Sequence, residues 1–332
     1  MEEKLIDIKN LEVHFPLKNE TIKAVDDVTW HINKGETVAI VGESGSGKSV
    51  TAMSLMRLTD YSGGKINSGS INFSKLNGDF LNLSKLSQNE MRNIRGKDIS
   101  MIFQEPMTSL NPVLKISTQM NEILIKHDGL NDEEATQKSI EMLKAVGIPE
   151  PERRIYDYPH QFSGGMRQRI MIAMALQCNP ALLIADEPTT ALDVTIQAQI
   201  LDLMMDLKDS RKDAAILLIT HDLAVIAETC DRVIVMYGGV IQEIATINEL
   251  FKNPIHPYTK ALMDSIPKMD TDTKRLKALK GMVPSILDLG DECKLCSRFD
   301  PEDCACLGTT IEPDLIQVSE GHFARVNPDI LK

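Results

Sequence analysis

Residues 42–49 combine glycines, a lysine and a serine in a pattern that can bind a polyphosphate. They read Gly-Glu-Ser-Gly-Ser-Gly-Lys-Ser and fit the pattern G-x-x-x-x-G-K-[ST]. Glycines let the backbone curl closely around an anion, because a Cβ would obstruct that path. Lys48 would reach the β- and γ-phosphates of a nucleotide, and the Ser49 hydroxyl would ligate Mg²⁺. The alternative is a glycine-rich turn that binds nothing.

The sequence on either side of this phosphate-binding loop favours the first interpretation. Residues 37–41 form a short apolar run rich in β-branched side chains, which predicts a buried parallel strand, and residues 50–56 can continue as a helix. The N–H groups at the helix start and the helix dipole would face the phosphates. The residues expected to bind the nucleotide are Gly42, Ser44, Gly45, Ser46, Gly47, Lys48, Ser49 and Val50.

Polar side chains also follow two other apolar runs. Asp186 and Glu187 come after residues 181–185, and His221 comes after residues 214–219. Ligands of an open parallel sheet bind beyond the carboxyl ends of the strands, so we expect these side chains to converge on the phosphate-binding loop. Asp186 would support Mg²⁺, Glu187 would polarise a water for attack on the γ-phosphate, and His221 would bond to that water or phosphate. Taken singly, the acidic pair is compatible with a loop start and His221 with a helix cap.

The elements that position these residues have an α/β order. Residues 5–15 and 21–32 alternate apolar and polar side chains, which predicts an antiparallel pair of half-exposed strands before the loop. Residues 99–103 read as a further strand, and from about 114 to 145 the periodicity is helical. Gly238-Gly239 between two apolar runs predicts a hairpin.

After about Lys268 the periodicity fades, while proline, glycine and acidic residues increase. We therefore expect a nucleotide-binding domain over residues 1–267 and a C-terminal extension over 268–332. Residues 105–178 would form a helical subdomain within the first of these.

Composition excludes some function classes. The 332-residue chain has a formal net charge of −12, which argues against nucleic acid as a partner. No apolar run approaches the ~18 residues that span a bilayer. Residues 1–4 lack the build of a signal peptide, so a cytoplasmic protein is expected, and any membrane role must come from a partner.

Further motifs resemble those of ATP-binding cassette (ABC) ATPases. Residues 163–169, Ser-Gly-Gly-Met-Arg-Gln-Arg, resemble the signature motif, Gln104 the Q-loop glutamine, and residues 191–193 the D-loop. With the phosphate-binding loop, the acidic strand end and His221, six motifs occur in family order over about residues 5–265. The common signature has Leu and Gln where this chain has Phe162 and Met166, but Ser163 and the glycines are retained.

This resemblance implies a fold and a set of roles. The fold is a P-loop ATPase domain with an antiparallel β subdomain and an α-helical subdomain. Phe15 falls where the family places an aromatic that stacks on adenine, although a phenylalanine on a strand is more often part of the core. The implied catalytic residues are Glu187, His221 and Gln104, the Mg²⁺ ligands are Ser49, Gln104 and Asp186, and the additional nucleotide contacts are Ser163, Gly164, Gly165 and Asp193.

The resemblance narrows to the ATPases of dipeptide and oligopeptide importers, on residues 103–112, 158–166 and 256–259. It implies a head-to-tail dimer with ATP between the phosphate-binding loop of one subunit and the signature motif of the other. A distinct second ATPase chain, two transmembrane permease subunits and an extracellular solute-binding protein are the implied partners, at the cytoplasmic face of the cell membrane. The alternatives are a nickel or other small-solute importer of the same subfamily, a cassette ATPase acting on DNA or ribosomes, and a binding-only cassette.

Four cysteines lie within fourteen residues of the extension, as Cys293-x₂-Cys296-x₇-Cys304-x-Cys306. In a cytosolic protein such a cluster indicates metal rather than disulfides, and four thiolates suit Zn²⁺ or an iron–sulfur cluster. The subfamily resemblance favours a four-iron cluster. The spacing departs from it, however, because no cysteine follows Gly321-His322. The alternative is a set of free thiols in a mobile tail.

Overall fold

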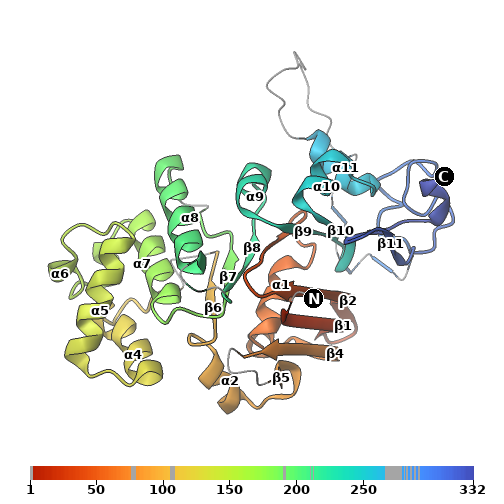
Figure 1. Cartoon of the computed structure of the whole chain (residues 1–332). Helices are drawn as coiled ribbons and strands as arrows, with labels where there is room; N and C mark the ends of the chain where they lie inside the picture. The colour runs from red at the N-terminus through yellow and green to blue at the C-terminus, as the bar shows by residue number, and fades with distance from the viewer. Residues whose placement is uncertain are drawn as a thin grey trace. The chain divides into compact units, whose positions relative to one another are not determined.

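The structure is a computed structural model that describes residues 3–75, 80–104, 109–189, 192–209, 211, 213–265, 279, 281, 283–284, 286–287, 289–290 and 292–332. Its helices and strands are labelled in Figure 1. The chain divides into two compact units, each assembled from separate segments. The first unit is Met1–Asp7, His31–Glu36 and Asn72–Ile219, and the second is Ile8–Trp30, Thr37–Ile71 and Thr220–Lys332.

Three parallel strands form the sheet of the first unit, in the order β8-β7-β6. They are β6 (Ile99–Ile102), β7 (Leu182–Asp186) and β8 (Ala215–Ile219), and every residue in them is buried. A continuous apolar run is what a strand covered on both faces requires. The strands predicted at these three places are confirmed.

Helices make up most of the rest of the first unit. In Figure 1, α4 to α7 form the yellow and green group. Asn131 caps α5 by accepting a hydrogen bond from the N–H of Glu134 at 3.0 Å, and Glu134 bonds back to the N–H of Asn131. The helices are α2 (Gln88–Ile94), α4 (Ile116–Asp128), α5 (Asp132–Ala145), α6 (Pro151–Arg154), α7 (Gly164–Leu176) and α8 (Val194–Asp209), with 3₁₀ turns η2 (Leu83–Lys85) and η3 (Pro159–Gln161).

Five strands form one sheet of the second unit, in the order β11-β12-β10-β9-β3. β3 (Thr37–Val41) runs parallel to β9 (Arg232–Tyr237), which forms an antiparallel hairpin with β10 (Val240–Thr246). Both residues of the hairpin turn are glycines with positive φ, 59° at Gly238 and 82° at Gly239, and the hairpin prediction is confirmed.

The C-terminal extension contributes two strands to this sheet. β12 (His322–Arg325) pairs with β10 and with β11 (Leu315–Ser319), both antiparallel. The sequence did not indicate these strands. The extension therefore packs into the same compact unit as the phosphate-binding loop. The predicted boundary near Lys268 lies outside the described residues, and the division at 267/268 stays a prediction.

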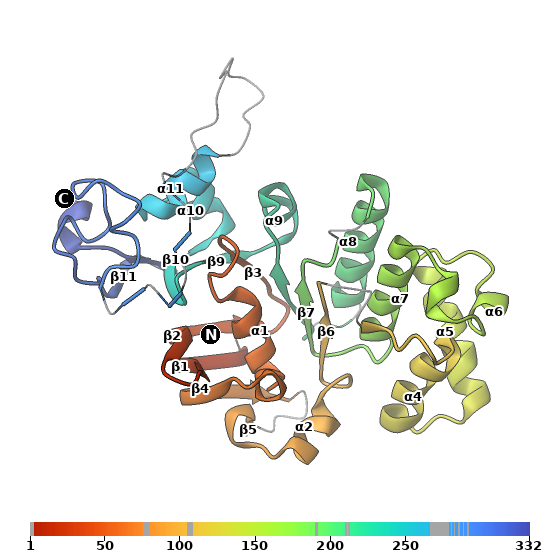
Figure 2. The ribbon, with the colours of Figure 1, turned by 180° about the vertical axis from the view of Figure 1, so that it is seen from behind.

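The second unit also holds most of an antiparallel sheet, whose strands β2 (Thr21–Asn33), β1 (Lys4–Pro16) and β4 (Lys65–Ser74) lie side by side in Figure 2. The antiparallel pair expected before the loop is confirmed. In the first unit, β5 (Phe80–Asn82) pairs with the last residues of β4. The remaining elements are α1 (Lys48–Leu55), α9 (Leu223–Thr229), α10 (Ile247–Lys252), α11 (Pro257–Asp264), η1 (Thr59–Ser62) and η4 (Pro328–Leu331).

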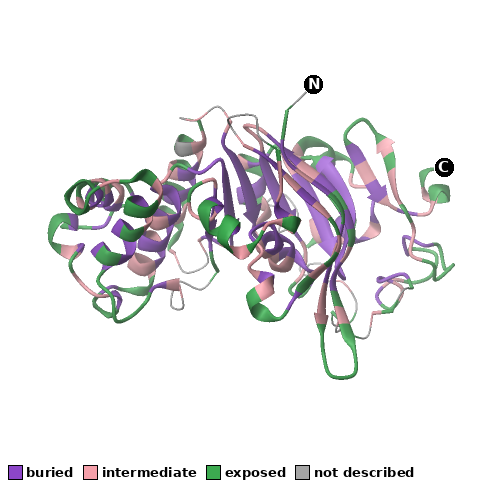
Figure 3. Cartoon of the chain, turned by 90° about the horizontal axis from the view of Figure 1, so that it is seen from below, coloured by how far each residue is buried: buried purple, intermediate pink, exposed green. Residues whose placement is uncertain are grey.

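Across the described helices and strands, the apolar side chains are mostly buried and the polar side chains mostly half-buried or exposed. Figure 3 shows the strands of the parallel sheets in purple and the helices with one buried and one exposed side. Helices that bury one stripe need about three or four apolar residues per two turns, as α4 and α5 have. Among the described helices, none is both long enough and apolar enough to cross a membrane.

Candidate active site

The phosphate-binding loop connects the end of β3 to the start of α1 and is shaped by glycines. A Cβ added at Gly42 (φ 150°) would lie 2.1 Å from the carbonyl oxygen of Met236. One added at Gly47 (φ 97°) would lie 2.6 Å from the carbonyl oxygen of Ala24. Both glycines are therefore required by close approach of neighbouring backbone as well as by their dihedral angles.

Lys48 lies inside this loop rather than in solvent, with only 9% of its surface exposed. Its Nζ donates hydrogen bonds to the carbonyl oxygens of Gly42 and Glu43, both at 2.8 Å. Within the described residues no side chain caps the start of α1. The loop thus presents a buried ammonium group next to an uncapped helix N-terminus, which is the arrangement that binds phosphate.

The first unit places Gln104, Asp186 and Glu187 at the carboxyl ends of β6 and β7. Asp186 ends β7 and is 5% exposed. Gln104 Nε2 donates to Glu187 Oε2 at 3.0 Å. Glu187 has a positive φ of 47°, and its N–H donates to the carbonyl oxygen of Ile219 at 2.8 Å. A non-glycine residue in this region is held there by its surroundings, as often occurs in active sites.

Ser163, the serine of the predicted signature motif, is the N-cap residue of α7. Ser163 Oγ accepts a hydrogen bond from the N–H of Met166 at 3.3 Å, and both Ser163 and Gly164 are exposed. Phe162 is only 3% exposed, and the guanidinium of Arg154 lies 5.7 Å from its ring centroid. Phe162 is therefore a core residue, and its departure from the common signature leaves the exposed Ser163 and Gly164 unchanged.

Asp193 lies at the start of α8, where its Oδ1 accepts a hydrogen bond from the N–H of Ile196 at 3.0 Å. Ala191, the first residue of the predicted D-loop, lies outside the described residues. Asp193 is exposed, so its carboxylate combines a capping role with access to solvent.

Phe15 and His221 belong to the second unit, as does the phosphate-binding loop. A Cβ added at Gly64 would lie 2.7 Å from the Phe15 ring, so the half-buried ring packs directly on the backbone of Gly64. His221 is exposed, and the side chain that caps α9 is Asp222, which accepts from the N–H of Ala224 at 2.9 Å. A capping role for His221, the alternative that the sequence left open, is therefore not what the structure has.

Two residues far along the chain, Tyr258 and Arg298, contact Glu43 of the phosphate-binding loop. The sequence did not indicate a role for any of the three at the loop. The N–H of Glu43 donates to Tyr258 Oη at 3.0 Å, and Nη2 of Arg298 donates to Glu43 Oε1 at 3.1 Å. Glu43 occupies a variable position of the loop pattern, and Arg298 lies 255 residues further along the chain. No local signal in the sequence connects them.

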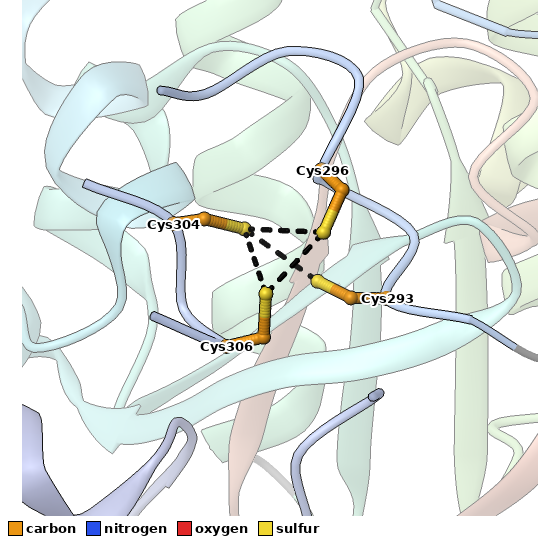
Figure 4. Close-up of side chains that lie close together, drawn as sticks. All are labelled: Cys293, Cys296, Cys304 and Cys306. Atoms are coloured by element: carbon orange, nitrogen blue, oxygen red, sulfur yellow. Dashed lines mark hydrogen bonds between the residues drawn. The ribbon is translucent and has the colours of Figure 1, made fainter. Parts of the chain in front are cut away.

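The four cysteine thiols converge in the second unit (Figure 4). Their sulfur atoms all lie within 4.8 Å of one another, and three of the four residues are buried. The separations are 3.6 Å for Cys293 and Cys304, 3.9 Å for Cys296 and Cys304, 3.3 Å for Cys296 and Cys306, and 3.5 Å for Cys304 and Cys306.

These separations test which metal the thiols fit. A tetrahedral ion with Zn–S bonds of 2.3 Å holds its sulfurs about 3.8 Å apart. A hydrogen bond from Cys293 lowers the pKa of the Cys304 thiol to about 5, whereas the bond to Cys304 raises the pKa of Cys293 and burial raises the pKa of Cys296. The donor set fits one tetrahedral ion as it stands, whereas a four-iron cluster requires the thiolates to stand further apart.

His322 is not one of the residues of the four-thiol site. His322 Nε2 lies 2.7 Å from Glu243 Oε1, and both side chains are fully buried. Glu243 also accepts hydrogen bonds from the N–H groups of Ile255 and His256. Burial opposes the charged form of Glu243, but these hydrogen bonds outweigh it, and its pKa lies below the ordinary value. The pair anchors the extension to β10.

Fold and motifs together define an ATP-binding cassette. Residues 25–190 match the family described as "ABC transporter", and residues 242–306 match "Oligopeptide/dipeptide transporter, C-terminal region". The chain is 51% identical over 321 residues to the oligopeptide transport ATP-binding protein AppD of Bacillus subtilis (strain 168), covering 97% of this chain and 95% of that protein. It is 48% identical over 316 residues to the dipeptide transport ATP-binding protein DppD of the same organism, covering 94% and 92%. The chain belongs to the ATP-binding proteins of the ABC transporter family.

Solved structures agree with this assignment. The dimeric ATP-binding cassette MJ0796 in a post-hydrolysis state, bound to ADP and Pi, matches with a TM-score of 0.65 and 30% identity, over 73% of this chain and 98% of that one. An ATP-binding subunit of an ABC transporter matches with a TM-score of 0.59 and 27% identity, over 74% and 91%. The cassette fold predicted from the sequence is confirmed.

Proposed function

We propose that this chain is the ATP-hydrolysing subunit of an ABC importer for dipeptides and oligopeptides. The observation that carries the proposal is the match of residues 242–306 to the C-terminal region of oligopeptide and dipeptide transporters, on a chain whose cassette retains its catalytic side chains. Relatives with about half of their residues identical are named as oligopeptide and dipeptide transport ATP-binding proteins.

The proposed chemistry divides the work among residues already described. Lys48 leaves the loop carbonyls to bind the β- and γ-phosphates, and Ser49, Gln104 and Asp186 would hold Mg²⁺, which would neutralise the phosphate charge. Glu187 accepts a proton from the attacking water, with its carboxylate oriented by the Gln104 amide. His221 bonds to the γ-phosphate or to that water, and Phe15 stacks on the adenine.

A second cassette completes the site in this proposal. Ser163 and Gly164 are exposed at the start of α7, where an uncovered helix N-terminus can face the γ-phosphate bound by another subunit, together with Gly165. Asp193 lies at the start of α8, and the adjacent Val194 is 84% exposed, as expected for a residue that a partner covers. We propose that the second cassette is a related but distinct chain.

Membrane subunits are the proposed partners of the helical subdomain. Large apolar side chains are exposed in this part of the first unit, which is unusual unless another protein covers them. Val113 is 75% exposed, Tyr156 52% and Ile125 42%. We place the chain at the cytoplasmic face of the cell membrane, held there by two permease subunits that receive solute from an extracellular binding protein.

The thiol site is proposed to hold a structural metal. The sulfur separations support a single tetrahedral ion, Zn²⁺ in particular, while the family resemblance favours a four-iron cluster. In either case the metal would supply cross-links between two turns of the extension, with Cys293 and Cys296 in one turn and Cys304 and Cys306 in the other.

The test is transport by the complex that the chain forms in its native cells. The tagged chain is purified with its partners, the partners are identified by mass spectrometry, and the complex is reconstituted in lipid vesicles. We expect a second ATPase chain, two permeases, and ATP-dependent uptake of a tripeptide or pentapeptide that the Glu187→Gln complex lacks. Uptake of Ni²⁺ but not of peptide would overturn the substrate, a complex without permeases would overturn the transport role, and two copies of this chain would overturn the heterodimer.

A further inference from the structure

We propose that Arg298 is a positioning residue for the phosphate-binding loop, and that metal occupancy of the four-thiol site sets the nucleotide affinity of the loop through it. The contact that motivates this is an ion pair between the extension and the loop, both in the second unit. The first half of the proposal depends on this contact alone. The second half rests on the metal occupancy proposed above.

The Arg298 guanidinium bonds to both carboxylate oxygens of Glu43. Nη2 donates to Oε1 at 3.1 Å, and Nη1 donates to Oε2. The arginine side chain is 4% exposed and the glutamate side chain 26%. A fork of this kind fixes orientation as well as distance, and loss of either partner leaves a desolvated charge behind. An ion pair at the surface would contribute little to stability, but the Arg298 side chain of this pair is buried.

Glu43 transmits this constraint to the lysine that binds phosphate. Its carbonyl oxygen accepts a hydrogen bond from Lys48 Nζ at 2.8 Å, while its N–H donates to Tyr258 Oη at 3.0 Å. One residue is therefore held at its side chain by Arg298, at its N–H by Tyr258, and at its carbonyl by Lys48. Release of the Glu43 side chain therefore changes the position of the loop backbone that holds Lys48 Nζ before it binds phosphate.

Arg298 packs on the buried ring of Tyr237, which in turn packs on Tyr258. The guanidinium carbon lies 5.7 Å from the ring centroid of Tyr237, and the rings of Tyr237 and Tyr258 are 4.9 Å apart. Neither tyrosine is exposed at all. A cation over an aromatic face in a desolvated site adds to the ion pair, so the arginine has one well-defined position.

The turn that carries Arg298 also carries two of the thiols. Arg298 follows Cys296 by two residues, and its N–H donates to the carbonyl oxygen of Leu295 at 2.9 Å. The N–H of Cys296 donates to the carbonyl oxygen of Cys293 at 3.3 Å. A metal that joins Cys293 and Cys296 to Cys304 and Cys306 fixes this turn, and with it the arginine.

A second contact runs beside the first. A Cβ added at Gly238 would lie 3.2 Å from the Cβ of Lys294, so the thiol turn packs closely on the turn of the β9–β10 hairpin. The N–H of Gly239 donates to the carbonyl oxygen of Ser46 in the phosphate-binding loop at 3.1 Å. The hairpin turn therefore contacts both the thiol turn and the phosphate-binding loop. The extension is thus linked to the loop through these backbone contacts as well as through the Arg298 side chain.

The experiment measures nucleotide affinity rather than turnover. Binding of mant-ATP with Mg²⁺ is measured by fluorescence on the full-length chain with its metal and on the same chain after chelation, with metal content determined for each sample. We compare wild type, Arg298→Ala, Arg298→Lys and the control Arg153→Ala, whose side chain is 73% exposed. Thermal unfolding of each variant reports folding separately.

We expect Arg298→Ala to weaken mant-ATP binding about tenfold, since loss of the arginine leaves the Glu43 carboxylate without its charged partner and releases the loop. Arg298→Lys should recover part of the affinity, because it keeps the charge and loses the fork. Chelation should weaken binding to wild type by a similar factor and weaken binding to Arg298→Ala clearly less, because the main contact that chelation releases is already lost in this variant. Arg153→Ala should bind as wild type does.

The outcomes separate the two halves of the proposal. Wild-type affinity in a folded Arg298→Ala protein would overturn the positioning role. Equal effects of chelation on wild type and Arg298→Ala would overturn the coupling, and a wild-type chain without metal would overturn the occupancy on which the coupling rests. Glu43→Gln tests the pair from the loop side: combined with Arg298→Ala, it should cost no more affinity than either single change.

Discussion

Gln104 Nε2 donates a hydrogen bond to Glu187 Oε2 at 3.0 Å, although the two residues are 83 positions apart in the chain. Each follows a buried parallel strand, β6 or β7, so the register of those strands fixes the separation of the two side chains. The amide of Gln104 thus holds one oxygen of the carboxylate that we propose as the base. A movement of Gln104 on ATP binding would therefore act directly on the carboxylate of Glu187, the proposed base.

The first prediction concerns this base. Glu187→Gln should retain mant-ATP binding and lower turnover at saturating ATP at least about 100-fold, because it keeps the shape of the side chain and removes the proton acceptor. Phosphate release by the complete transporter measures the turnover. Glu228→Gln, an exposed carboxylate on α9, is the control and should leave turnover unchanged. Unchanged hydrolysis by Glu187→Gln would exclude Glu187 as the base.

The sequence predicted the parts of the fold whose signal is local. The buried strands β3, β7 and β8 are continuous apolar runs, and the capping box of Asn131 and Glu134 involves only neighbouring residues at the start of α5. Glycine spacing likewise identified the phosphate-binding loop before any contact was known. These signals depend on residues that are neighbours in the chain, so they survive without knowledge of the fold.

The extension was not predictable in the same way. β12 is anchored by a buried pair between His322 and Glu243, which are 79 residues apart, and the Arg298 to Glu43 contact spans 255. Neither pair has a spacing that indicates a helix face or a strand face. Cysteine spacing did reveal the thiol cluster, but sequence alone left the metal open because the sulfur separations depend on how the two turns pack.

The second prediction uses two glycines of the phosphate-binding loop as a matched pair. Both have positive φ, 150° at Gly42 and 80° at Gly45, but a Cβ would meet the Met236 carbonyl oxygen at Gly42 and no atom within 4 Å at Gly45. Gly45→Ala should lower the free energy of unfolding by only about 1 kcal/mol, the strain of the dihedral angle. Gly42→Ala should cost clearly more and abolish mant-ATP binding. Thermal unfolding and fluorescence titration measure both, and equal effects would contradict the close approach seen here.

The third prediction concerns adenine recognition by Phe15. Phe15→Ala should weaken ATP binding about tenfold, since stacking of a base on an aromatic ring contributes roughly 1–3 kcal/mol. Competition by inorganic tripolyphosphate, which has no base, should be unaffected. Phe80→Ala, at a phenylalanine that is 70% exposed, is the control. An equal loss of affinity for tripolyphosphate would show that Phe15 supports the fold and does not act by binding adenine.

The fourth prediction concerns metal in the extension. Cys304 is fully buried and its sulfur lies within 3.9 Å of the sulfurs of the other three cysteines, so Cys304→Ser should abolish metal binding. Elemental analysis of anaerobically purified protein should give about one zinc per chain in wild type. Iron with visible charge-transfer absorbance would identify a cluster instead. Cys178→Ser, outside the group of four, should keep the full metal content, and a metal-free wild type would remove the site altogether.

The fifth prediction is a pH dependence that arises at His256. This residue is fully buried at the start of α11, where its Nδ1 accepts a hydrogen bond from the N–H of Tyr258 at 3.2 Å. Burial lowers the pKa of His256 to about 3, with Arg325 and Lys260 acting in the same direction and the Glu243 carboxylate opposing them. In the unfolded chain its pKa returns to about 6.5.

The sign follows from proton uptake. Between pH 6.5 and about 3 the unfolded chain binds a proton at this histidine and the folded chain does not, so the free energy of unfolding falls as the pH falls, by about 1.4 kcal/mol per pH unit. His256→Asn keeps a cap acceptor and does not titrate. From pH 7 to pH 5, wild type should therefore lose about 2 kcal/mol more than the variant. Trp30, the chain's single tryptophan, is buried in the same unit and reports its urea unfolding by fluorescence. The same loss in both proteins would mean that His256 is not the group that makes this unit sensitive to acid.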